Sequence, residues 1–372
     1  MHYALTDSTI STLNSTKKGW CGIRDIKSMT GEELRQWVTD NGFPAFRAVQ
    51  IGDWLGKGVT NFDEMRNLPA DLKKKLQTSC YISVATIAKK QVSRYDKTVK
   101  YLFSFHDGEC VEAVLMSYHH GYSICISTQV GCKMGCTFCA TGKSGFSRSL
   151  TASEMLAQIE AAQRDEGVRI SNVVLMGMGE PLDNFDNVVR FLHLAGSQKG
   201  LHIGMRHITL STCGIVPKIY ELAQCGLPVN LAVSLHAPND AIRSQTMPVA
   251  RVYPMEQLLQ ACRDYFETTG RRVTFEYALI SGVNDTDACA RELGKQLRGM
   301  NCHVNLIPVN AVAGTGYQKS NVQRQQSFAN ILAVNGVTAT VRRTLGSDID
   351  ASCGQLRRKH LSKGGQSLGN FQ

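Results

Sequence analysis

The sequence predicts an α/β protein in which six or seven alternating strands and helices form a barrel or part of one. From residue 121 onward, short apolar runs typical of strands alternate with longer runs of helical periodicity. The expected strands are Tyr122–Ser127, Asn172–Met176, His207–Leu210, Val229–Ser234, Val273–Leu279, His303–Ile307 and Val337–Arg342. The expected helices cover residues 151–164, 185–195, 215–225, 254–268, 284–298 and 321–334. Such alternation produces β/α units on a parallel sheet, and the chemistry of these barrels lies in the loops that follow the strands.

The chain before residue 121 has a different pattern. Residues 24–80 are expected to be helical, and Thr30 with Glu33 three residues later fits a capping box at the start of one helix. A hairpin is predicted next, because Val99–Phe105 alternates in polarity and Cys110–Met116 returns after a turn.

These patterns divide the chain into five parts. They are a flexible N-terminus at 1–20, a helical accessory domain at 21–95, a β-hairpin linker at 96–120, the barrel at 121–345 and a C-terminal segment at 346–372 that ends in a basic tail.

The composition is that of a folded, basic protein. Hydrophobic residues make up 43% of the 372 residues, and the net charge is +10 with a pI of about 9.0. A polyanionic partner would explain the charge, and a solvated surface with an excess of lysine and arginine is the alternative. Thirteen scattered cysteines, no signal-peptide pattern and no apolar run of about 20 residues predict a cytoplasmic protein whose clustered cysteines serve metal binding or catalysis.

Three cysteines form the strongest motif. Cys132, Cys136 and Cys139 follow the first barrel strand with the spacing C-x3-C-x2-C on a glycine-bearing loop. A structural zinc site would require a fourth ligand, and Cys125 is poorly placed for it because it lies on the strand itself. Three thiolates on a [4Fe–4S] cluster leave one iron open to an outside ligand, which suits a cluster that binds and reduces a substrate.

Polar groups follow the other barrel strands. Gly179 lets a ligand approach the backbone closely, and the carboxylate of Glu180 is suited to accept a hydrogen bond from an ammonium group. Further polar groups at the ends of strands are Ser211, Ser234, His236 and Asn310. Taken singly, each of these is more often a helix cap or a turn residue, and their common placement is what favours a binding site.

Several motifs together resemble one family. The cysteine motif, with Phe138 before its last cysteine, resembles the radical SAM superfamily. D-I-D-A-S-C-G-Q-L, S-T-Q-V-G-C-x3-C-x2-C-A-T-G, M-G-M-G-E-P-L, S-L-H-A-P and N-L-I-P-V-N resemble the RlmN/Cfr family of radical SAM RNA adenine methyltransferases, more the RlmN branch than the Cfr branch. The resemblance covers residues 24–356 and implies a partial (β/α)6 barrel of the radical SAM type. It also implies that the helical accessory domain at 21–95 binds RNA.

The resemblance implies two cofactors, one [4Fe–4S] cluster on Cys132, Cys136 and Cys139 and two molecules of S-adenosylmethionine (SAM) per turnover. The positions that match SAM-binding residues are Gly179, Glu180, Ser211, Ser234, Leu235, His236 and Asn310.

The resemblance also implies roles for three residues in covalent chemistry. Cys353 would carry the methyl group on sulfur, and Cys125 would release the product by forming a transient Cys125–Cys353 disulfide. Glu112 would accept the ring proton of the substrate. Without the resemblance, Glu112 would be interpreted as an ordinary outward residue of the hairpin.

The implied partners are 23S rRNA and the tRNA anticodon loop, methylated at C2 of adenosine, and an electron donor such as flavodoxin or ferredoxin. The implied state is a monomer that has no contact with membranes. Two alternatives remain at this point: a Cfr-like adenine-C8 rRNA methyltransferase and a non-catalytic, zinc-dependent RNA-binding protein.

Overall fold

The computed structural model describes residues 23–197, 200–309, 316–343, 345–349, 354–357 and 360. The expected flexible N-terminus at 1–20 and the candidate residues Asn310 and Cys353 therefore lie outside the described residues. The chain divides into two compact units, Met1–Ser83 and Val84–Gln372, each of which has its own hydrophobic core.

The first unit is a small helical domain, as the sequence predicts. Its elements are β1 (Arg24–Asp25), η2 (Ile26–Ser28), α1 (Gly31–Asp40), α2 (Phe46–Gly56), η3 (Phe62–Glu64), α3 (Ala70–Ser79) and β2 (Cys80–Tyr81), where η denotes a 3-10 helix. The expected capping box is present, because Thr30 Oγ1 accepts the N–H of Glu33 and the Glu33 carboxylate accepts the N–H of Thr30. Trp37 on α1 and Ile51 on α2 are buried in its core.

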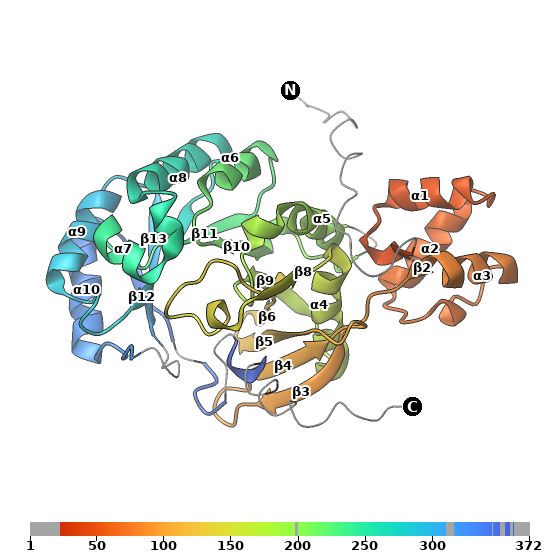
Figure 1. Ribbon diagram of the computed structural model, residues 1–372, viewed down its shortest axis with the longest axis horizontal. Helices are drawn as coiled ribbons and strands as arrows, with labels where there is room; N and C mark the ends of the chain where they lie inside the picture. Colours follow the sequence, from red (N-terminus) through yellow and green to blue (C-terminus); the bar gives the residue numbers. More distant parts are fainter. Residues whose placement is uncertain are drawn as a thin grey trace. The chain divides into compact units, whose positions relative to one another are not determined.

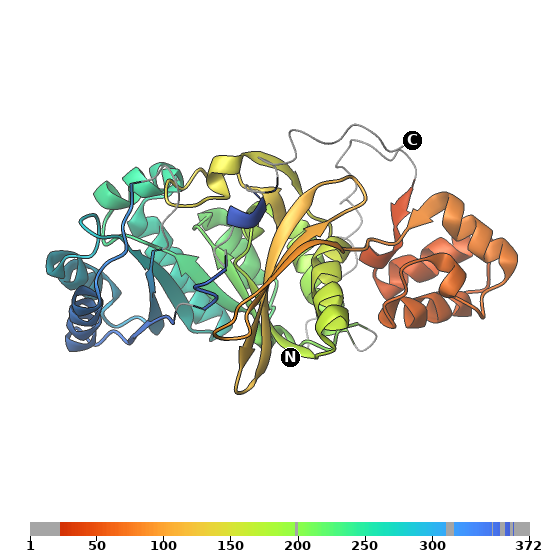
Figure 2. The same cartoon turned by 90° about the horizontal axis from the view of Figure 1, so that it is seen from below.

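The second unit is built on one ten-stranded sheet (Figures 1 and 2). Seven strands are parallel and adjacent in chain order: β6 (Gly121–Cys125), β9 (Ile170–Leu175), β10 (Ile208–Thr212), β11 (Asn230–Ser234), β12 (Val273–Leu279), β13 (Cys302–Pro308) and β14 (Ala339–Val341). They correspond to the seven predicted strands, so the predicted α/β fold with a partial barrel is confirmed. A short separate hairpin is formed by β7 (Gln129–Gly131) and β8 (Phe146–Ser149).

Helices connect the parallel strands and pack on one face of the sheet (Figure 1). They are α4 (Ala152–Glu166), α5 (Phe185–Gly196), α6 (Val216–Gln224), α7 (Asp240–Thr246), α8 (Met255–Thr269), α9 (Asp287–Leu297) and α10 (Val322–Val334). Short 3-10 helices lie at η4 (Gly142–Ser144), η5 (Pro181–Asn184), η6 (Met205–His207) and η7 (Pro248–Arg251). The sequence predicts six of the α-helices and misses α7, which at two turns is too short to show a helical period. Within the described part of the chain, no helix combines the length and hydrophobicity that crossing a bilayer requires.

The predicted hairpin forms but is not a separate linker. It consists of β4 (Val99–Ser104) and β5 (Cys110–Tyr118), and β5 pairs with β6, so the hairpin extends the barrel sheet. A further strand, β3 (Thr86–Val92), pairs with β4 at the sheet edge. The two compact units consequently divide at Ser83, whereas the sequence pattern puts the end of the helical domain at 95.

Candidate active site

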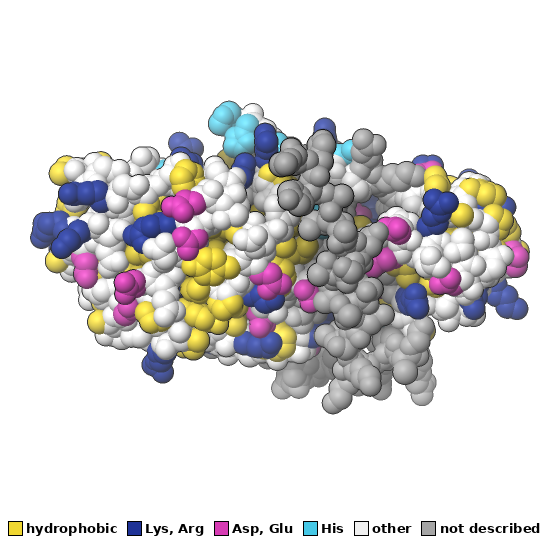
Figure 3. All heavy atoms as spheres, turned by 90° about the horizontal axis from the view of Figure 1, so that it is seen from above, with side chains coloured by type: hydrophobic (Ala, Val, Ile, Leu, Met, Phe, Trp, Pro, Cys, Tyr) yellow, Lys and Arg dark blue, Asp and Glu magenta, His cyan; other side chains and the backbone are white. Residues whose placement is uncertain are grey.

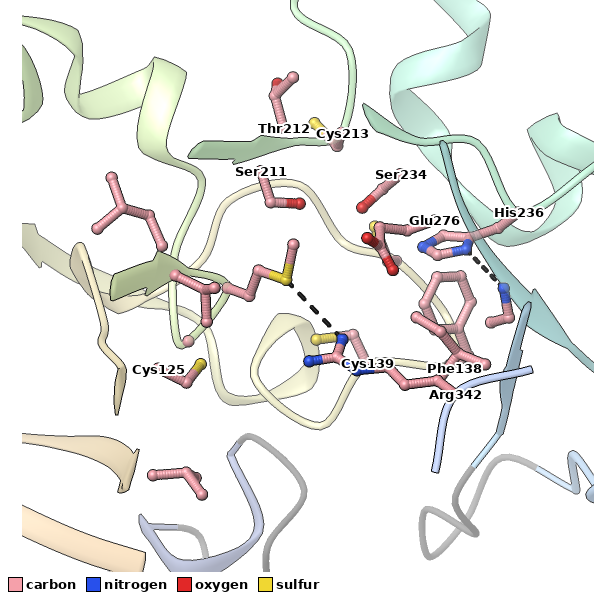
Figure 4. Close-up of a pocket in the computed structure, with 18 of the residues that line it drawn as sticks. Cys125, Phe138, Cys139, Ser211, Thr212, Cys213, Ser234, His236, Glu276 and Arg342 are labelled. Carbon is pink, nitrogen blue, oxygen red and sulfur yellow. Dashed lines mark hydrogen bonds between the residues drawn. The ribbon is translucent and has the colours of Figure 1, made fainter. Parts of the chain in front are cut away.

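A cavity of about 430 Å³ lies at the C-terminal ends of the parallel strands, where the barrel rule predicts the chemistry (Figure 4). Its lining includes Cys125, the three motif cysteines and, of the predicted SAM-binding residues, Gly179, Glu180, Ser211, Ser234 and His236. The side chains of Ser211 and Ser234 point toward the middle of the cavity from β10 and β11. The structure thus brings together groups that lie more than 100 residues apart in the sequence.

The motif cysteines lie on the loop between β7 and β8. The N–H of Cys132 donates to the carbonyl of Gly145 at 2.9 Å, which closes the base of the loop. Gly131 makes this closure possible, because it has a φ of +84° and an added Cβ would lie 1.9 Å from the Gly145 oxygen. Farther along, the N–H of Thr137 donates to the carbonyl of Thr246 at 2.9 Å and ties the loop to α7.

The three motif thiols fit a [4Fe–4S] cluster. Burial raises the pKa of Cys132 to about 11 and that of Cys136 to about 12, so these ligands need a positive partner to ionise. Within the described ranges, no three His, Cys, Asp or Glu side chains are arranged to hold one metal ion. Each cysteine of a [4Fe–4S] cluster binds a different iron atom, so its sulfur atoms do not need to converge on one point.

Glu180, which follows β9, is fixed by backbone donors. One carboxylate oxygen accepts the N–H of Cys213 at 2.7 Å, and the other accepts the N–H of Leu182 at 3.0 Å. The side chain is buried, and this burial raises the pKa of Glu180. The preceding Gly179 has a φ of +105°, and an added Cβ would lie 2.6 Å from the Cβ of Gln129, so the turn requires glycine. A carboxylate oriented in this way has lone pairs left for a ligand's ammonium group.

His236, after β11, has its ring fixed on two sides. Its Nδ1 accepts the N–H of Ala278 at 2.9 Å, and its ring meets that of Phe138 edge-on with the centroids 5.0 Å apart (Figure 4). Burial lowers the pKa of His236 to about 3, so the imidazole is neutral at physiological pH. The neighbouring Leu235 differs from its predicted companions, because its side chain is buried in the core and does not line the cavity.

The sequence pattern does not reveal Arg243, which is fully buried on α7. Its guanidinium donates to the carbonyl oxygens of Leu235, Cys213 and Ser234 and so braces two strand-end loops. Its Nη1 is buried without a hydrogen-bond partner among the described residues, and its positive charge partly offsets the burial that raises the pKa of Cys136. A buried cation beside the cysteine loop is what an anionic cluster would require. Long arginine side chains on short polar helices are usually solvated, so only the tertiary structure shows this role.

Glu112 on β5 is buried, which rejects the alternative of an outward hairpin residue. One of its oxygens lies 2.6 Å from Lys100 Nζ and also accepts the N–H of Gly354 at 2.6 Å. The other oxygen accepts the N–H of Arg357 at 2.6 Å. The carboxylate therefore holds the chain that directly follows the undescribed Cys353.

Gly354 also contacts the end of the cysteine loop. It has a φ of +81°, and an added Cβ would lie 2.6 Å from the nitrogen of Thr141, two residues after Cys139. On β6, Cys125 is buried and lines the same cavity as the motif cysteines. Gly354, the described neighbour of Cys353, thus lies against the loop that carries the cysteine motif.

Two family models match the chain. The radical SAM superfamily model matches residues 126–290, which contain the cysteine motif and four of the barrel strands. The model described as ribosomal RNA large subunit methyltransferase N-terminal domain matches residues 24–82, which correspond to the first compact unit.

Relatives match almost the whole chain. The chain is 54% identical over 337 residues to the probable dual-specificity RNA methyltransferase RlmN of Alkaliphilus oremlandii, with 91% of this chain and 98% of the relative covered. It is 51% identical over 344 residues to the protein of the same name from Clostridium tetani, with 92% and 99% covered. The structure matches the crystal structure of a radical SAM methyltransferase from Sphaerobacter thermophilus with a TM-score of 0.85 and 44% identity, over 89% of this chain and 98% of that one. The chain therefore belongs to the RlmN family of radical SAM methyltransferases.

Proposed function

We propose that this protein methylates carbon 2 of an adenosine in RNA, with 23S rRNA and the tRNA anticodon loop as its substrates. The relatives are named dual-specificity RNA methyltransferases, and the net charge of +10 suits a polyanionic partner. Carbon 2 of adenine is electrophilic and offers no lone pair, so direct polar transfer of a methyl group from SAM would fail there. A radical route removes this difficulty.

The single observation that carries the proposal is the packing of Gly354. Its N–H is held by Glu112, and its Cα lies against Thr141 at the end of the cysteine loop. Cys353 precedes Gly354 in the sequence, and Cys125 lines the cavity. We infer that a methyl carrier at Cys353, a second thiol at Cys125 and the motif cysteines act on one bound nucleotide.

Membership of the radical SAM superfamily implies one [4Fe–4S] cluster and SAM. When bound, they supply a 5′-deoxyadenosyl radical that removes a hydrogen atom. We assign the cluster to Cys132, Cys136 and Cys139. Glu180 would accept from the ammonium group of SAM, the hydroxyls of Ser211 and Ser234 would bind its polar groups, and the neutral ring of His236 would form a wall of the pocket.

The chain's own thiols carry the remaining chemistry. Cys353 accepts a methyl group on sulfur from a first SAM, and its methylene carbon becomes bonded to the base after a second SAM is consumed. Glu112, ion-paired with Lys100, accepts the ring proton. The Cys125 thiolate then attacks the sulfur of Cys353, which forms the disulfide and breaks the sulfur–carbon bond. The electron pair of that bond stays with the methylene carbon, which takes up a proton from water and remains on the base as the methyl group.

The product decides the regiochemistry. Anaerobically reconstituted protein would be incubated with RNA, SAM and a reductant, and the digested nucleosides would be analysed by mass spectrometry and NMR. We expect 2-methyladenosine. The appearance of 8-methyladenosine would instead assign the protein the Cfr-like reaction.

The cluster is tested by metal analysis of the same preparation. We expect about four irons per chain, with matching sulfide, and loss of both in Cys132→Ala. Cys225→Ala is the matched control, because Cys225 lies at the end of α6 and does not line the cavity. Zinc in place of iron would support the non-catalytic alternative. We further propose that the protein acts as a cytoplasmic monomer with flavodoxin or ferredoxin as electron donor.

A further inference from the structure

A row of polar side chains crosses the inside of the barrel and begins at Ser234, one of the predicted cofactor residues. In the strand register, Ser234 of β11 pairs with Glu276 of β12, and Glu276 pairs with Asn305 of β13. Thr340 of β14 continues the same row. Paired residues of neighbouring parallel strands point to the same face, and Phe275 on the opposite face is buried in the core. Barrel interiors are normally filled by branched apolar side chains, so a polar row indicates space for a ligand.

Glu276 is the member of this row with an unused hydrogen-bonding atom. Only 3% of the residue is exposed, and its Oε1 accepts a hydrogen bond from Asn305 Nδ2 at 2.9 Å. Its Oε2 is buried and has no hydrogen-bond partner among the residues that the structure describes. In Figure 4 the carboxyl group points into the cavity beside Ser234. A buried acceptor without a partner is costly, and it is expected where a ligand supplies the donor.

A second cavity, of about 1140 Å³, meets the first at this level. Both are lined by Met176, Glu276 and Arg342, so the space continues from the SAM pocket toward the N-terminal ends of the strands. The second cavity opens between the edge strand β14 and the corner that follows β5, which contributes residues 117–119.

The wall of the second cavity is basic. Arg271, Arg272, Arg342 and Arg343 line it, and Arg272 and Arg343 are exposed. On the helical face shown in Figure 3, by contrast, basic and acidic side chains are interspersed. Guanidinium groups are suited to phosphate oxygens, so this wall fits the backbone of a nucleic acid whose base has entered the barrel.

We propose that the second cavity receives the adenosine to be methylated and that Glu276 recognises the amino group of its base. The inference rests on the proposed function, because it assumes an RNA adenosine as substrate. SAM also contains an adenine, and position distinguishes the two. Glu276 pairs with Ser234 in the strand register, but Glu276 also lines the second cavity, whereas Ser234 and the other predicted SAM-binding residues that line the first cavity do not line the second. It therefore lies where the SAM pocket meets the second cavity.

The chemistry of Glu276 matches the pairing edge of adenine. Burial raises the pKa of Glu276, although Arg342 lowers it in part, and this favours the neutral carboxyl group. A neutral carboxyl group accepts one hydrogen bond and donates another, which complements the amino group and the adjacent ring nitrogen of adenine. Enzymes that act on an extruded base commonly recognise this edge. Carbon 2 adjoins it, whereas carbon 8 lies on the opposite side of the purine.

The test compares two RNAs on the reconstituted holoenzyme. One stem-loop carries adenosine at the target position, and the other carries purine riboside, which lacks only the amino group. We expect the wild-type protein to bind the adenosine RNA roughly 10- to 100-fold more tightly, as measured by anaerobic fluorescence anisotropy. Glu276→Met, which keeps the volume and removes the acceptor, is expected to bind both RNAs equally. Thr274→Val is the matched control in the same cavity and should keep the wild-type preference.

Two further measurements distinguish the outcomes. Reductive cleavage of SAM without RNA is measured at full iron content, and its loss in Glu276→Met would assign Glu276 to the cofactor's adenine and overturn the inference. Equal binding of both RNAs by the wild type, or a preference that persists in Glu276→Met, would also overturn it. If the Met variant fails to retain iron, Glu276→Asp is used instead, because it withdraws the carboxyl group by one methylene. This variant should lower the preference for the adenosine RNA at least about threefold. An unchanged preference would overturn the inference. The wild type could also prefer the adenosine RNA in a way that requires Glu276 and yet form no methylated product. That result would contradict the proposed function and support this inference.

Discussion

Lys100 and Glu112 form an ion pair that is closed to solvent: their charged atoms lie 2.6 Å apart, and the two side chains are 0% and 2% exposed. The pair links neighbouring strands, β4 and β5, under the described residues that follow Cys353. A buried pair of this kind is weak evidence for stability by itself, because two charges have lost their water. Replacing one residue of the pair therefore tests how strongly the other depends on its partner.

We expect Lys100→Met to lower the free energy of unfolding by about 3–5 kcal/mol, because Glu112 would remain buried without its cation. Urea unfolding under anaerobic conditions measures this. Lys90→Met is the control, since Lys90 of the edge strand β3 forms a partly exposed ion pair with Asp165 of α4. This substitution should lower the free energy of unfolding by no more than about 1 kcal/mol. Equal costs for the two variants would show that the burial of the Lys100 pair has no energetic consequence.

Gly354→Ala should separate cofactor loading from methyl transfer. The new Cβ would meet the backbone of Thr141, so the C-terminal segment cannot keep its contact with the cysteine loop. We expect the iron content to be normal. We expect the number of methyl groups bound to the protein, measured by intact mass, to fall at least about 10-fold, because the Cys353 thiol would be misplaced. Gly282→Ala is matched in φ, at +72°, but has open space around its Cβ and should retain methylation. Normal methylation of Gly354→Ala would contradict the packing argument.

Cys125→Ala should trap the protein–RNA adduct. Without the second thiol, the sulfur–carbon bond between the chain and the base has no attacking group, so the covalent species accumulates and is visible on a denaturing gel. Cys213→Ala is the control, because Cys213 is also buried and lines the same cavity. Normal turnover by Cys125→Ala would remove Cys125 from the proposed chemistry, and adduct formation in a Cys353→Ala variant would remove Cys353.

His236 predicts a pH dependence of stability. Its pKa is about 3 in the folded state and 6.5 in its ordinary state, so the unfolded chain binds the proton first as the pH falls. The contribution of neutral His236 to the free energy of unfolding is fully present above about pH 6.5. It decreases by about 1.4 kcal/mol per pH unit as the pH falls from 6.5 to 3. His236→Asn tolerates the positive φ of 55° and can still accept the N–H of Ala278. Urea unfolding at pH 7.5 and 5.5 should show a steeper loss for the wild type than for the variant, and parallel losses would contradict the assignment.

The sequence was sufficient for those features that depend on local pattern. The seven parallel strands follow from apolar periodicity, and the cysteine motif follows from spacing within a single loop. Arg243 and Glu276 were missed because their roles arise from contacts between distant segments. An arginine on a two-turn helix and a glutamate inside a strand have no local signature. Glu276 becomes conspicuous only when the register aligns it with Ser234 and Asn305.

The ten-stranded sheet ends at β14 on one side and β3 on the other, and among the described residues these edges do not pair. An open side of this kind gives the interior a second approach besides the one at the strand ends. An extended substrate can lie along the open side while one unit enters the interior, so an internal position of a folded polymer is as accessible as a terminal one.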